Sequence, residues 1–442
     1  MTKTLLRGGC VLTLGAKTSN YATADVLIDA DTVVEVGPGL RARDAEVMDA
    51  SDTIVMPGFV DTHRHVSRAL FRNLGERPPG PSPVTAPGFG DHYDVEDVYA
   101  ATLIGLLGAV EAGITTVVDR FDAREDPGLT EAALRAHADS GLRTVFVYAT
   151  RPGVSGHEGS HPMDLAVATR LREAAGPSTT LAFGSVVPTA GDPLGIALDW
   201  AQARELGLRI HAHGGLGMGE PGNLAAVAGI LGTDVVLAHC ARFDDADLDA
   251  IASSGACVSL APSSEMAGGM GSPPIQQLID RDIRPGLGVD DELVGPGDMF
   301  AQMRGTISVQ HATVFDRKLA GKAGVPKLMT TRDVIRCATA DGARVAGVGD
   351  VAGSLEPGKR ADIVMLRTDR PNIFPINDAI GAVVWGMDTS NVDSVFASGR
   401  VVMRGGVLSA DVGRARQLAS TARDRVAAAA GIPVGASVGG ER

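Results

Sequence analysis

The feature that most constrains this chain is an alternation of short apolar runs with amphipathic segments, repeated eight times between residues 53 and 352. Each run is continuous rather than alternating, as expected for a parallel strand that is buried on both faces. A helical pattern follows each run, and a glycine often marks its end. Eight such units predict an α/β fold, a closed (β/α)8 TIM barrel, with an open doubly wound sheet as the structural alternative.

The two ends of the chain have a different texture. Residues 1–52 and 353–410 contain short alternating strands separated by turn residues. This pattern is typical of a small β-sandwich, and we expect both chain ends to build it together beside the barrel of residues 53–352. Residues 411–442 are predicted to form a last surface helix, about 411–430, and a tail.

Composition narrows the possible partners and compartment. The net charge of -13 disfavours nucleic acid and anionic membranes as partners. No apolar run approaches the roughly 18 residues that a spanning helix needs, and the N-terminal segment lacks an export signal. The four cysteines show no C-x-x-C spacing, which is typical of a reducing compartment. We therefore expect a cytoplasmic protein, either monomeric or a homo-oligomer.

The first predicted strand ends in "VMPGFVDTHRH", which carries His63 and His65. Side chains two apart in a strand share a face, so both imidazoles point the same way. They also lie at the C-terminal end of the strand, where barrel enzymes build their active sites. An isolated H-x-H is a weak signal, because two partly exposed loop histidines have the same spacing.

Other strand ends carry the same kind of residue. Strand five ends in "RIHAHGG" with His211 and His213, strand six ends in "VVLAHC" with His239, and strand eight ends in "GLGVDDE" with Asp290. Five of the ten histidines therefore fall at three strand ends. Imidazoles and a carboxylate that converge in this way form an open site for a divalent metal ion.

Several of these motifs, taken together, resemble the metal-dependent amidohydrolase superfamily. They are "PGFVDTHRH", "HAH" on strand five, "LAHC" on strand six, "GVDD" on strand eight and the closing "GSLEPGKRADIVML". Within that superfamily the chain is similar to the branch of cytosine and guanine deaminases and triazine hydrolases. The resemblance covers nearly the whole chain and implies hydrolysis of carbon–nitrogen bonds that are not peptide bonds.

The resemblance also implies roles for individual residues. His63 and His65 match the first-strand metal ligands, and Asp290 matches an aspartate that is both a ligand and the proton acceptor from the metal-bound water. His239 matches a histidine that contacts the substrate or the attacking water. Binuclear relatives carry a lysine on strand four, whereas "TTLAFGSVV" has none. A single divalent ion is therefore expected, with zinc as the first choice and iron as the alternative.

Two features leave alternatives open. Strand five offers two histidines, and we favour His213 as the ligand because it is nearer the strand end, with His211 a layer deeper. Deaminases of this branch usually carry a glutamate three residues after that ligand, where this chain has Leu216. Glu265, in "LAPSSEM" after strand seven, is the candidate replacement, and a solvated loop carboxylate is its alternative interpretation.

Three further residues have weaker assignments. Arg68 follows the first strand and either binds substrate or is simply solvated. Asp119 ends strand two, where it either supports a metal ligand or has a structural role. His137 lies in an amphipathic helical segment and is expected on its outer face.

The predicted residues favour hydrolytic deamination of a small nitrogen heterocycle that resembles a pyrimidine, purine or triazine. In that reaction the metal activates water, Asp290 accepts its proton and His239 stabilises the developing charge. The missing glutamate raises a second possibility, hydrolysis of a cyclic or linear amide or of a ring-carbon halide, because a better leaving group needs less ring protonation. A catalytically inactive barrel scaffold is the non-enzymatic alternative.

Overall fold

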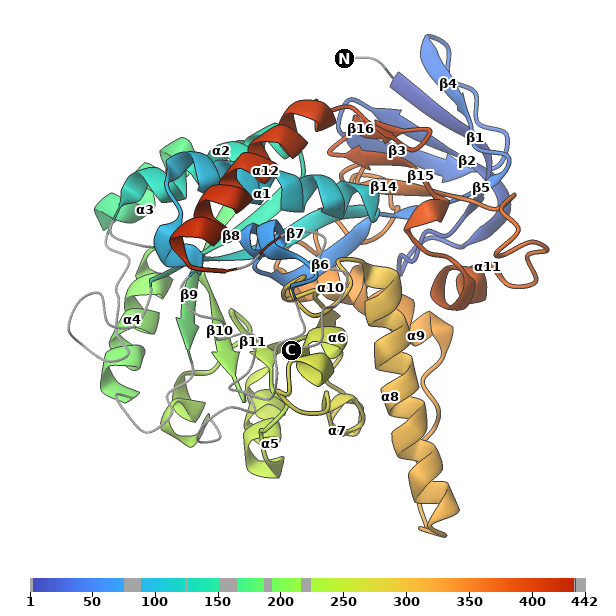
Figure 1. The fold of residues 1–442 in the computed structure, drawn as a ribbon. Helices are drawn as coiled ribbons and strands as arrows, with labels where there is room; N and C mark the ends of the chain where they lie inside the picture. The colour runs from blue at the N-terminus through green and yellow to red at the C-terminus, as the bar shows by residue number, and fades with distance from the viewer. Residues whose placement is uncertain are drawn as a thin grey trace, which may run out of the picture.

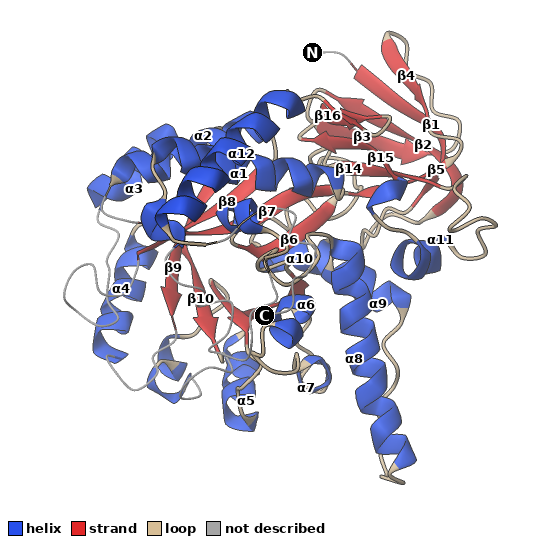
Figure 2. Ribbon diagram, viewed as in Figure 1, coloured by secondary structure: helices blue, strands red, loops and turns tan. Residues whose placement is uncertain are grey.

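The computed structural model describes residues 3–74, 89–123, 126–150, 165–186, 193–215, 224–432 and 434. The chain forms a barrel wrapped by helices and a separate sheet beside it (Figures 1 and 2). The N-terminal and C-terminal strands of the chain share that separate sheet, so the two ends of the sequence meet in one layer.

Eight parallel strands follow one another around the barrel in sequence order. They are β6 (Phe59–Arg64), β7 (Ile114–Ala123), β8 (Arg143–Thr150), β9 (Thr179–Val186), β10 (Arg209–Gly214), β11 (Val235–His239), β12 (Cys257–Leu260) and β13 (Gly286–Leu287). The barrel closes between its first and last strands, where the amide of His65 donates to the carbonyl of Asp290 at 2.6 Å and the amide of Asp290 donates to that of His63 at 2.8 Å. The expected (β/α)8 barrel is therefore confirmed.

Helices cover the outside of the barrel and extend past it. They are α1 (Val95–Glu111), α2 (Pro127–Ser140), α3 (Leu165–Ala174), α4 (Pro193–Glu205), α5 (Asp245–Ser254), α6 (Pro262–Ala267), α7 (Ile275–Ile279), α8 (Met299–Leu319), α9 (Thr331–Cys337), α10 (Ala340–Val345), α11 (Ala379–Gly381) and α12 (Val412–Ala429). The segment after β10, expected to be one helix, forms two short 3-10 turns at Leu224–Ala226 and Ala228–Ile230. Two glycines, Gly229 and Gly232, weaken a helix in that segment.

The separate sheet has nine strands, in the order β17-β16-β15-β14-β5-β1-β2-β3, and β4 pairs with β1. They are β1 (Lys3–Val11), β2 (Tyr21–Asp29), β3 (Thr32–Gly37), β4 (Ala45–Asp49), β5 (Thr53–Pro57), β14 (Ile363–Arg367), β15 (Val392–Ala397), β16 (Arg400–Arg404) and β17 (Val407–Leu408). Its apolar side chains form a core of their own, which includes Leu6, Val26 and Phe396.

The apolar run at the start of the expected barrel is divided between the two sheets. Residues 53–57 form β5, which pairs with β14 and β1, and the barrel begins only at Phe59. Gly58 separates the two strands, and a Cβ atom there would lie 2.1 Å from Thr115. The chain can therefore pass from one sheet to the other only where the backbone lacks a side chain.

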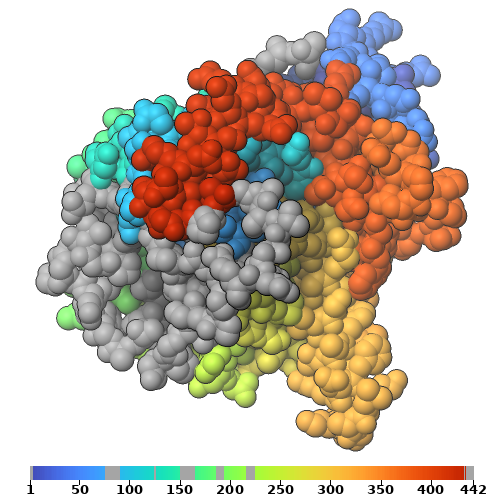
Figure 3. Space-filling model, in the orientation of Figure 1, coloured from blue at the N-terminus to red at the C-terminus, as the bar shows by residue number. Residues whose placement is uncertain are grey.

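The last helix, α12, packs along α1 and forms an outer layer over it (Figure 3). Its buried residues, Ala415, Ala422, Val426 and Ala427, are mostly small, which allows the two helices to approach closely. Across the residues that the structure describes, no helix combines the length and the apolar character needed to cross a membrane.

Candidate metal centre and active site

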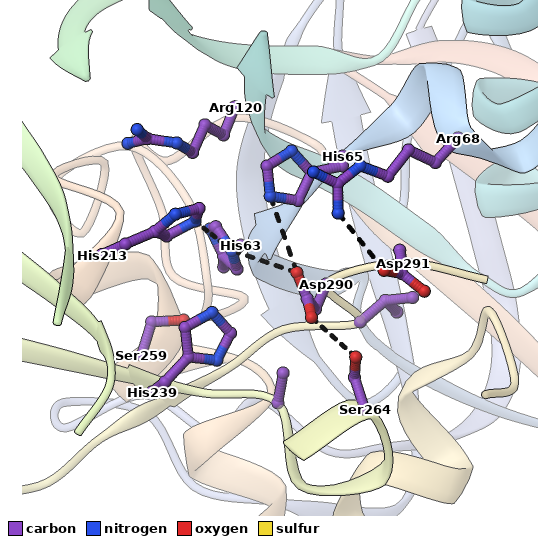
Figure 4. A network of polar contacts seen from close by, with 12 residues as sticks. His63, His65, Arg68, Arg120, His213, His239, Ser259, Ser264, Asp290 and Asp291 are labelled. Atoms are coloured by element: carbon purple, nitrogen blue, oxygen red, sulfur yellow. Dashed lines mark hydrogen bonds and ion pairs between the residues drawn. The ribbon is translucent and has the colours of Figure 1, made fainter. Parts of the chain in front are cut away.

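Four of the predicted histidines and the predicted aspartate converge at the C-terminal ends of the barrel strands (Figure 4). The Nε2 atoms of His63 and His213 lie 3.1 Å apart. Asp290 Oδ1 lies 3.3 Å from His63 Nε2 and 3.7 Å from His65 Nε2. Two overlapping groups can be defined, His63–His65–His213 and His63–His239–Asp290. Within each group, the three donor atoms lie within 4.8 Å of one another.

Two of these residues have an unusual backbone conformation. His239 has a φ of 78° and Asp290 a φ of 65°, both in the left-handed region that side chains other than glycine seldom adopt. His239 is the last residue of β11, and Asp290 follows β13 by three positions. Backbone strain of this kind is found preferentially where a site needs a side chain aimed in one direction.

The three histidines that face one another are held in the neutral state. Burial, opposed by the hydrogen bond to Asp290, lowers the pKa of His63 to about 4. Burial and then the nearby guanidinium of Arg68 hold the pKa of His65 well below its usual value. Burial and then Arg120 do the same for His213. A neutral imidazole has a free lone pair, which is the form that coordinates a metal.

His239 differs from the other three because Glu265 holds its Nδ1. Its Nδ1 lies 3.3 Å from Oε1 of Glu265, which also accepts the amide of Ala261 at 2.8 Å. Burial acts to lower the pKa of His239, but the hydrogen bond to Glu265 and the charge of Asp290 outweigh it and raise that pKa. Glu265 is fully buried on α6, so the alternative of a solvated loop carboxylate is wrong.

Asp290 is buried and hydrogen-bonded on both oxygens. Its Oδ2 accepts the hydroxyl of Ser264 at 2.6 Å, and its Oδ1 faces the histidines. Burial acts to raise the pKa of Asp290, but the hydrogen bond to His63 and the charge of His239 hold it well below the usual range. The carboxylate is therefore oriented and ionised before any ligand arrives.

His211 lies beneath the cluster, as the sequence predicted. Its ring stacks on that of His63 with centroids 5.1 Å apart, and its Nε2 lies 3.2 Å from the carbonyl of Thr62. It contributes no donor atom to either group that can hold a metal. His213 lies two residues further along β10, nearer the barrel mouth. Its Nε2 is the strand-five nitrogen that lies beside Nε2 of His63 on the first strand.

Arg68 is fixed by carboxylates at the edge of the site. Its Nη1 donates to Asp291 at 3.3 Å, and its Nη2 lies 3.7 Å from Asp122. A quarter of its side chain is exposed, so it lies between the buried cluster and the solvent. The position expected for a deaminase glutamate, Leu216, lies outside the described residues.

Two residues of the site were missed by sequence reasoning. Ser264 precedes Glu265 and gave no signal of its own. Arg120 is on β7, and Figure 4 shows its side chain extending above His213. A signal for Arg120 did exist, because Asp119, Arg120 and Asp122 place three charges within four positions of a buried strand.

Asp119 and His137 form a buried pair behind the first strand. Asp119 accepts the amide of Val66 at 3.1 Å and lies 2.7 Å from His137 Nε2, while His137 Nδ1 lies 2.9 Å from the hydroxyl of Thr144. His137 is 1% exposed, so the expectation that it lies on the outer face of its helix is wrong. The ring can be buried because Asp119 and Thr144 are hydrogen-bond partners of both of its nitrogens, and sequence periodicity does not reveal these partners.

The donor set fits a divalent metal ion of the zinc type. Three imidazole nitrogens held neutral and one ionised carboxylate match the ligands that zinc takes in catalytic sites. With the nitrogens of His63 and His213 so close, two lone pairs would repel each other unless a proton or a cation lies between them. The residues that could hold an ion are those of the two overlapping groups, His63, His65, His213, His239 and Asp290.

Comparison with known proteins identifies the family to which this barrel belongs. A model of the amidohydrolase family matches residues 54–402. A 5-methylthioadenosine/S-adenosylhomocysteine deaminase from Desulforudis audaxviator is 30% identical over 399 residues, which cover 87% of this chain and 90% of that protein. An adenosine deaminase from Xanthomonas campestris with bound zinc superposes with a TM-score of 0.82 at 19% identity, covering 96% of this chain and 98% of that one.

A second solved structure has the same fold. The atrazine chlorohydrolase from Arthrobacter aurescens, complexed with zinc, superposes with a TM-score of 0.79 at 22% identity and covers 95% of this chain and 100% of that one. Likeness at this level of identity establishes the barrel with its accessory sheet. The family match spans most of the sequence and includes every residue of the histidine cluster, and the chain therefore belongs to the amidohydrolase family.

Proposed function

We propose that this protein is a metal-dependent hydrolase that releases ammonia from an amino-substituted nitrogen heterocycle. The observation that carries the proposal is the convergence of three neutral histidines with Asp290 and the His239–Glu265 pair at one end of the barrel. The relative from Desulforudis audaxviator and the structural neighbour from Xanthomonas campestris are both named as deaminases of adenine-containing nucleosides or of adenosine, which supports the same reaction class.

The proposed cofactor is one zinc ion held by His63, His65, His213 and Asp290. Both structural neighbours described above contain zinc, and strand β9 of this chain has no lysine that would serve a second ion. When bound, such an ion supplies a Lewis acid that lowers the pKa of a coordinated water to about 7. Iron is the alternative ion for a site of this composition.

Asp290 is the proposed proton acceptor. Its Oδ1 faces the three imidazoles, while Ser264 and the barrel-closing backbone hydrogen bonds prevent the carboxylate from rotating away. A carboxylate held in this position can take a proton from the attacking water and return it to the leaving amine, which is general base and then general acid catalysis.

His239 is the proposed electrostatic partner of the substrate. Because Glu265 binds its Nδ1, the ring is oriented with Nε2 toward the cluster, and the raised pKa keeps it protonated to a higher pH than an isolated histidine. A protonated imidazole can donate to the ring atom on which negative charge develops. Glu265 acts on His239 as a positioning residue, and its Oε2, which is buried without a hydrogen-bond partner, is the atom that would serve the substrate contact expected from the sequence.

A second candidate reaction is the release of chloride or of an amine from a ring carbon. It is favoured by Leu216 at the position where related deaminases carry a glutamate, and by the shared fold with a chlorohydrolase. The same water activation and the same proton acceptor serve this reaction, because only the leaving group differs.

The test is a release assay on the zinc-loaded protein with aminopyrimidines, aminopurines, aminotriazines, their chloro analogues and cyclic amides. Ammonia release that depends on the metal, and that is lost in Asp290→Asn, is the expected result. Chloride or amine release without ammonia would favour the second candidate. Less than about one-tenth of an ion per chain after zinc loading, with no turnover, would favour the inactive scaffold.

A further inference from the structure

Arg120 is a buried cation inside the barrel that the chemistry described above does not use. It is 5% exposed and its side chain extends from β7 above His213 (Figure 4). Its charge is felt by the histidines, because Arg120 is the largest influence after burial that lowers the pKa of His213. The guanidinium therefore lies within the same space as the proposed metal ligands.

The hydrogen bonds of Arg120 occupy one side of its guanidinium. Within the described residues they come from Nη1 alone, which donates to the carbonyl of Ser185 at 2.9 Å and to that of His211 at 3.1 Å. These acceptors are neutral and hold the side chain in place between β9 and β10. The Nε atom is buried and has no hydrogen-bond partner. The edge formed by Nε and Nη2 is the one that can bind two oxygens of one anion side by side.

The charge of Arg120 is poorly neutralised by the part of the chain that the structure describes. There, the carboxylate that approaches Arg120 is Asp122, at 3.7 Å from Nε, which is too long for a hydrogen bond. Asp122 is one-third exposed and also lies 3.7 Å from Arg68 Nη2 and 3.8 Å from His65 Nδ1. It therefore makes no close ion pair with any of these three residues. A buried ion without a close counter-ion carries a large desolvation cost, which a stable fold tolerates where a ligand supplies the counter-charge.

We propose that Arg120 is a specificity-determining residue, and that the Nε–Nη2 edge of its guanidinium binds an anionic group on the heterocyclic substrate. The anion is a ring carboxylate or a deprotonated ring imide, since both place negative oxygens in the plane of a ring. The inference rests on the proposed function for the position of that ring beside the histidines. It adds the substrate class: an acidic heterocycle rather than a neutral one.

The planar fork of arginine matches this chemistry better than lysine does. Two parallel N–H groups fit two coplanar oxygens, and a charge-assisted hydrogen bond in a site shielded from water is stronger than one at the surface. The competing interpretation is purely structural, in which Arg120 does no more than join β9 to β10 through the two carbonyls. The two interpretations differ in whether the protein prefers an anionic ring.

The experiment measures binding of product-like rings that carry no amino group, so turnover does not interfere. Isothermal titration of the zinc-loaded protein compares uracil with uracil-5-carboxylate and barbiturate, and hypoxanthine with urate. We expect at least one anionic ring to bind about 10- to 100-fold more tightly than its neutral partner, the range for a hydrogen bond to a charged group. Uracil-5-carboxylate and barbiturate distinguish the carboxylate from the ring imide.

Three variants assign the preference. Arg120→Gln should equalise the neutral and anionic rings, Arg120→Lys should retain only part of the preference, and Arg68→Gln should leave most of it. Zinc content and the melting temperature of Arg120→Lys should match those of the parent protein. If Arg120→Gln does not fold, the Lys variant decides, because it keeps the charge and loses the fork.

Several outcomes would overturn the inference. Equal affinities for every pair in the parent protein, a full preference in Arg120→Lys, or loss of the preference in Arg68→Gln alone would each reject it. A clear anion preference in a protein that releases no ammonia would instead reject the proposed function and keep the anion site. Ammonia release without any preference would do the reverse.

Discussion

The site has two halves that use the same residue type in opposite ways. In one half, His63, His65 and His213 face one another, and burial keeps them neutral. In the other half, His239 is paired with Glu265 and its pKa is raised. His63, His65 and His239 are all buried and His213 is partly buried, so burial alone does not decide the direction in which a histidine pKa shifts here. Asp290 lies 3.3 Å from Nε2 of His63, whose Nδ1 has no hydrogen-bond partner, whereas Nδ1 of His239 is held by Glu265. The additional carboxylate at His239 is what outweighs burial there.

Asp290 lies between the halves, 3.3 Å from His63 Nε2 and in the same donor group as His239. In the proposed function, the neutral half binds the metal, Asp290 transfers the proton and the His239 half stabilises the developing charge. Changes to single residues can break this division or sharpen it.

The largest effect is expected for Asp290→Asn, which removes the proton acceptor while keeping the shape of the side chain. We expect kcat to fall about 10⁴-fold, the upper end for loss of a general base, because this residue is also a proposed metal ligand. Steady-state ammonia release measures the effect. Asp291→Asn is the matched control, because the carboxylate of Asp291 contacts Arg68 instead of the histidines. This substitution should lower kcat far less. A kcat for Asp290→Asn within a few-fold of the parent would remove Asp290 from this role.

The next effect concerns the neutral half. His213→Ala should weaken zinc binding by more than roughly 100-fold, which exceeds the usual cost of losing a partner outside the ligand shell. His211→Ala should mostly keep the ion, because this ring stacks beneath His63 without offering a donor atom to the group. Elemental analysis after dialysis against zinc buffers compares the two variants. Reversed metal contents would exchange their assignments.

A smaller effect is expected for His239→Gln. This variant should keep the zinc content of the parent and lose about 10²- to 10³-fold in kcat, as when one donor to a developing negative charge is removed. Loss of the metal together with activity would place His239 in the metal-binding half. Elemental analysis and the kcat assay on one preparation make the distinction.

The smallest effect is expected for Glu265→Gln, which removes a charge and little volume. Glu265 raises the pKa of His239, so its neutral replacement lowers that pKa. Activity that needs protonated His239 falls as the pH rises through this pKa, and the basic limb of the kcat profile should therefore move to lower pH. His239→Gln should lack that limb altogether. An unchanged basic limb in Glu265→Gln would show that the pair does not control the reaction.

Much of the fold was predictable because its signals are local. Continuous apolar runs separated by helical patterns repeat along residues 53–352, and each unit can be recognised without its neighbours. The histidines were predictable for a related reason. The C-terminal ends of parallel barrel strands meet at one face, so residues at those ends must lie close together whatever their distance in sequence.

The rest depended on contacts between segments that no periodicity reveals. Residues 53–57 belong to the separate sheet, because β5 finds its partners in β1 and β14. Glu265 is buried because the short helix α6 turns back on β11, and His137 is buried because its helix presents it to Asp119. Arg120 has its place in the site because β9 and β10 each provide a carbonyl that accepts a hydrogen bond from one side of its guanidinium.

The sequence by itself determined the eight-stranded barrel, the use of both chain ends in one accessory β domain, and the set of imidazoles and the carboxylate at the barrel mouth. Hydrophobic periodicity and the geometry of parallel strands are enough for these. Only the tertiary structure decided which histidines have a lowered pKa and which has a raised one, and that Arg120 has no close counter-ion among the described residues. The charge state and pairing of a buried group depend on the dipoles and charges within a few ångströms of it, and those come from distant parts of the chain.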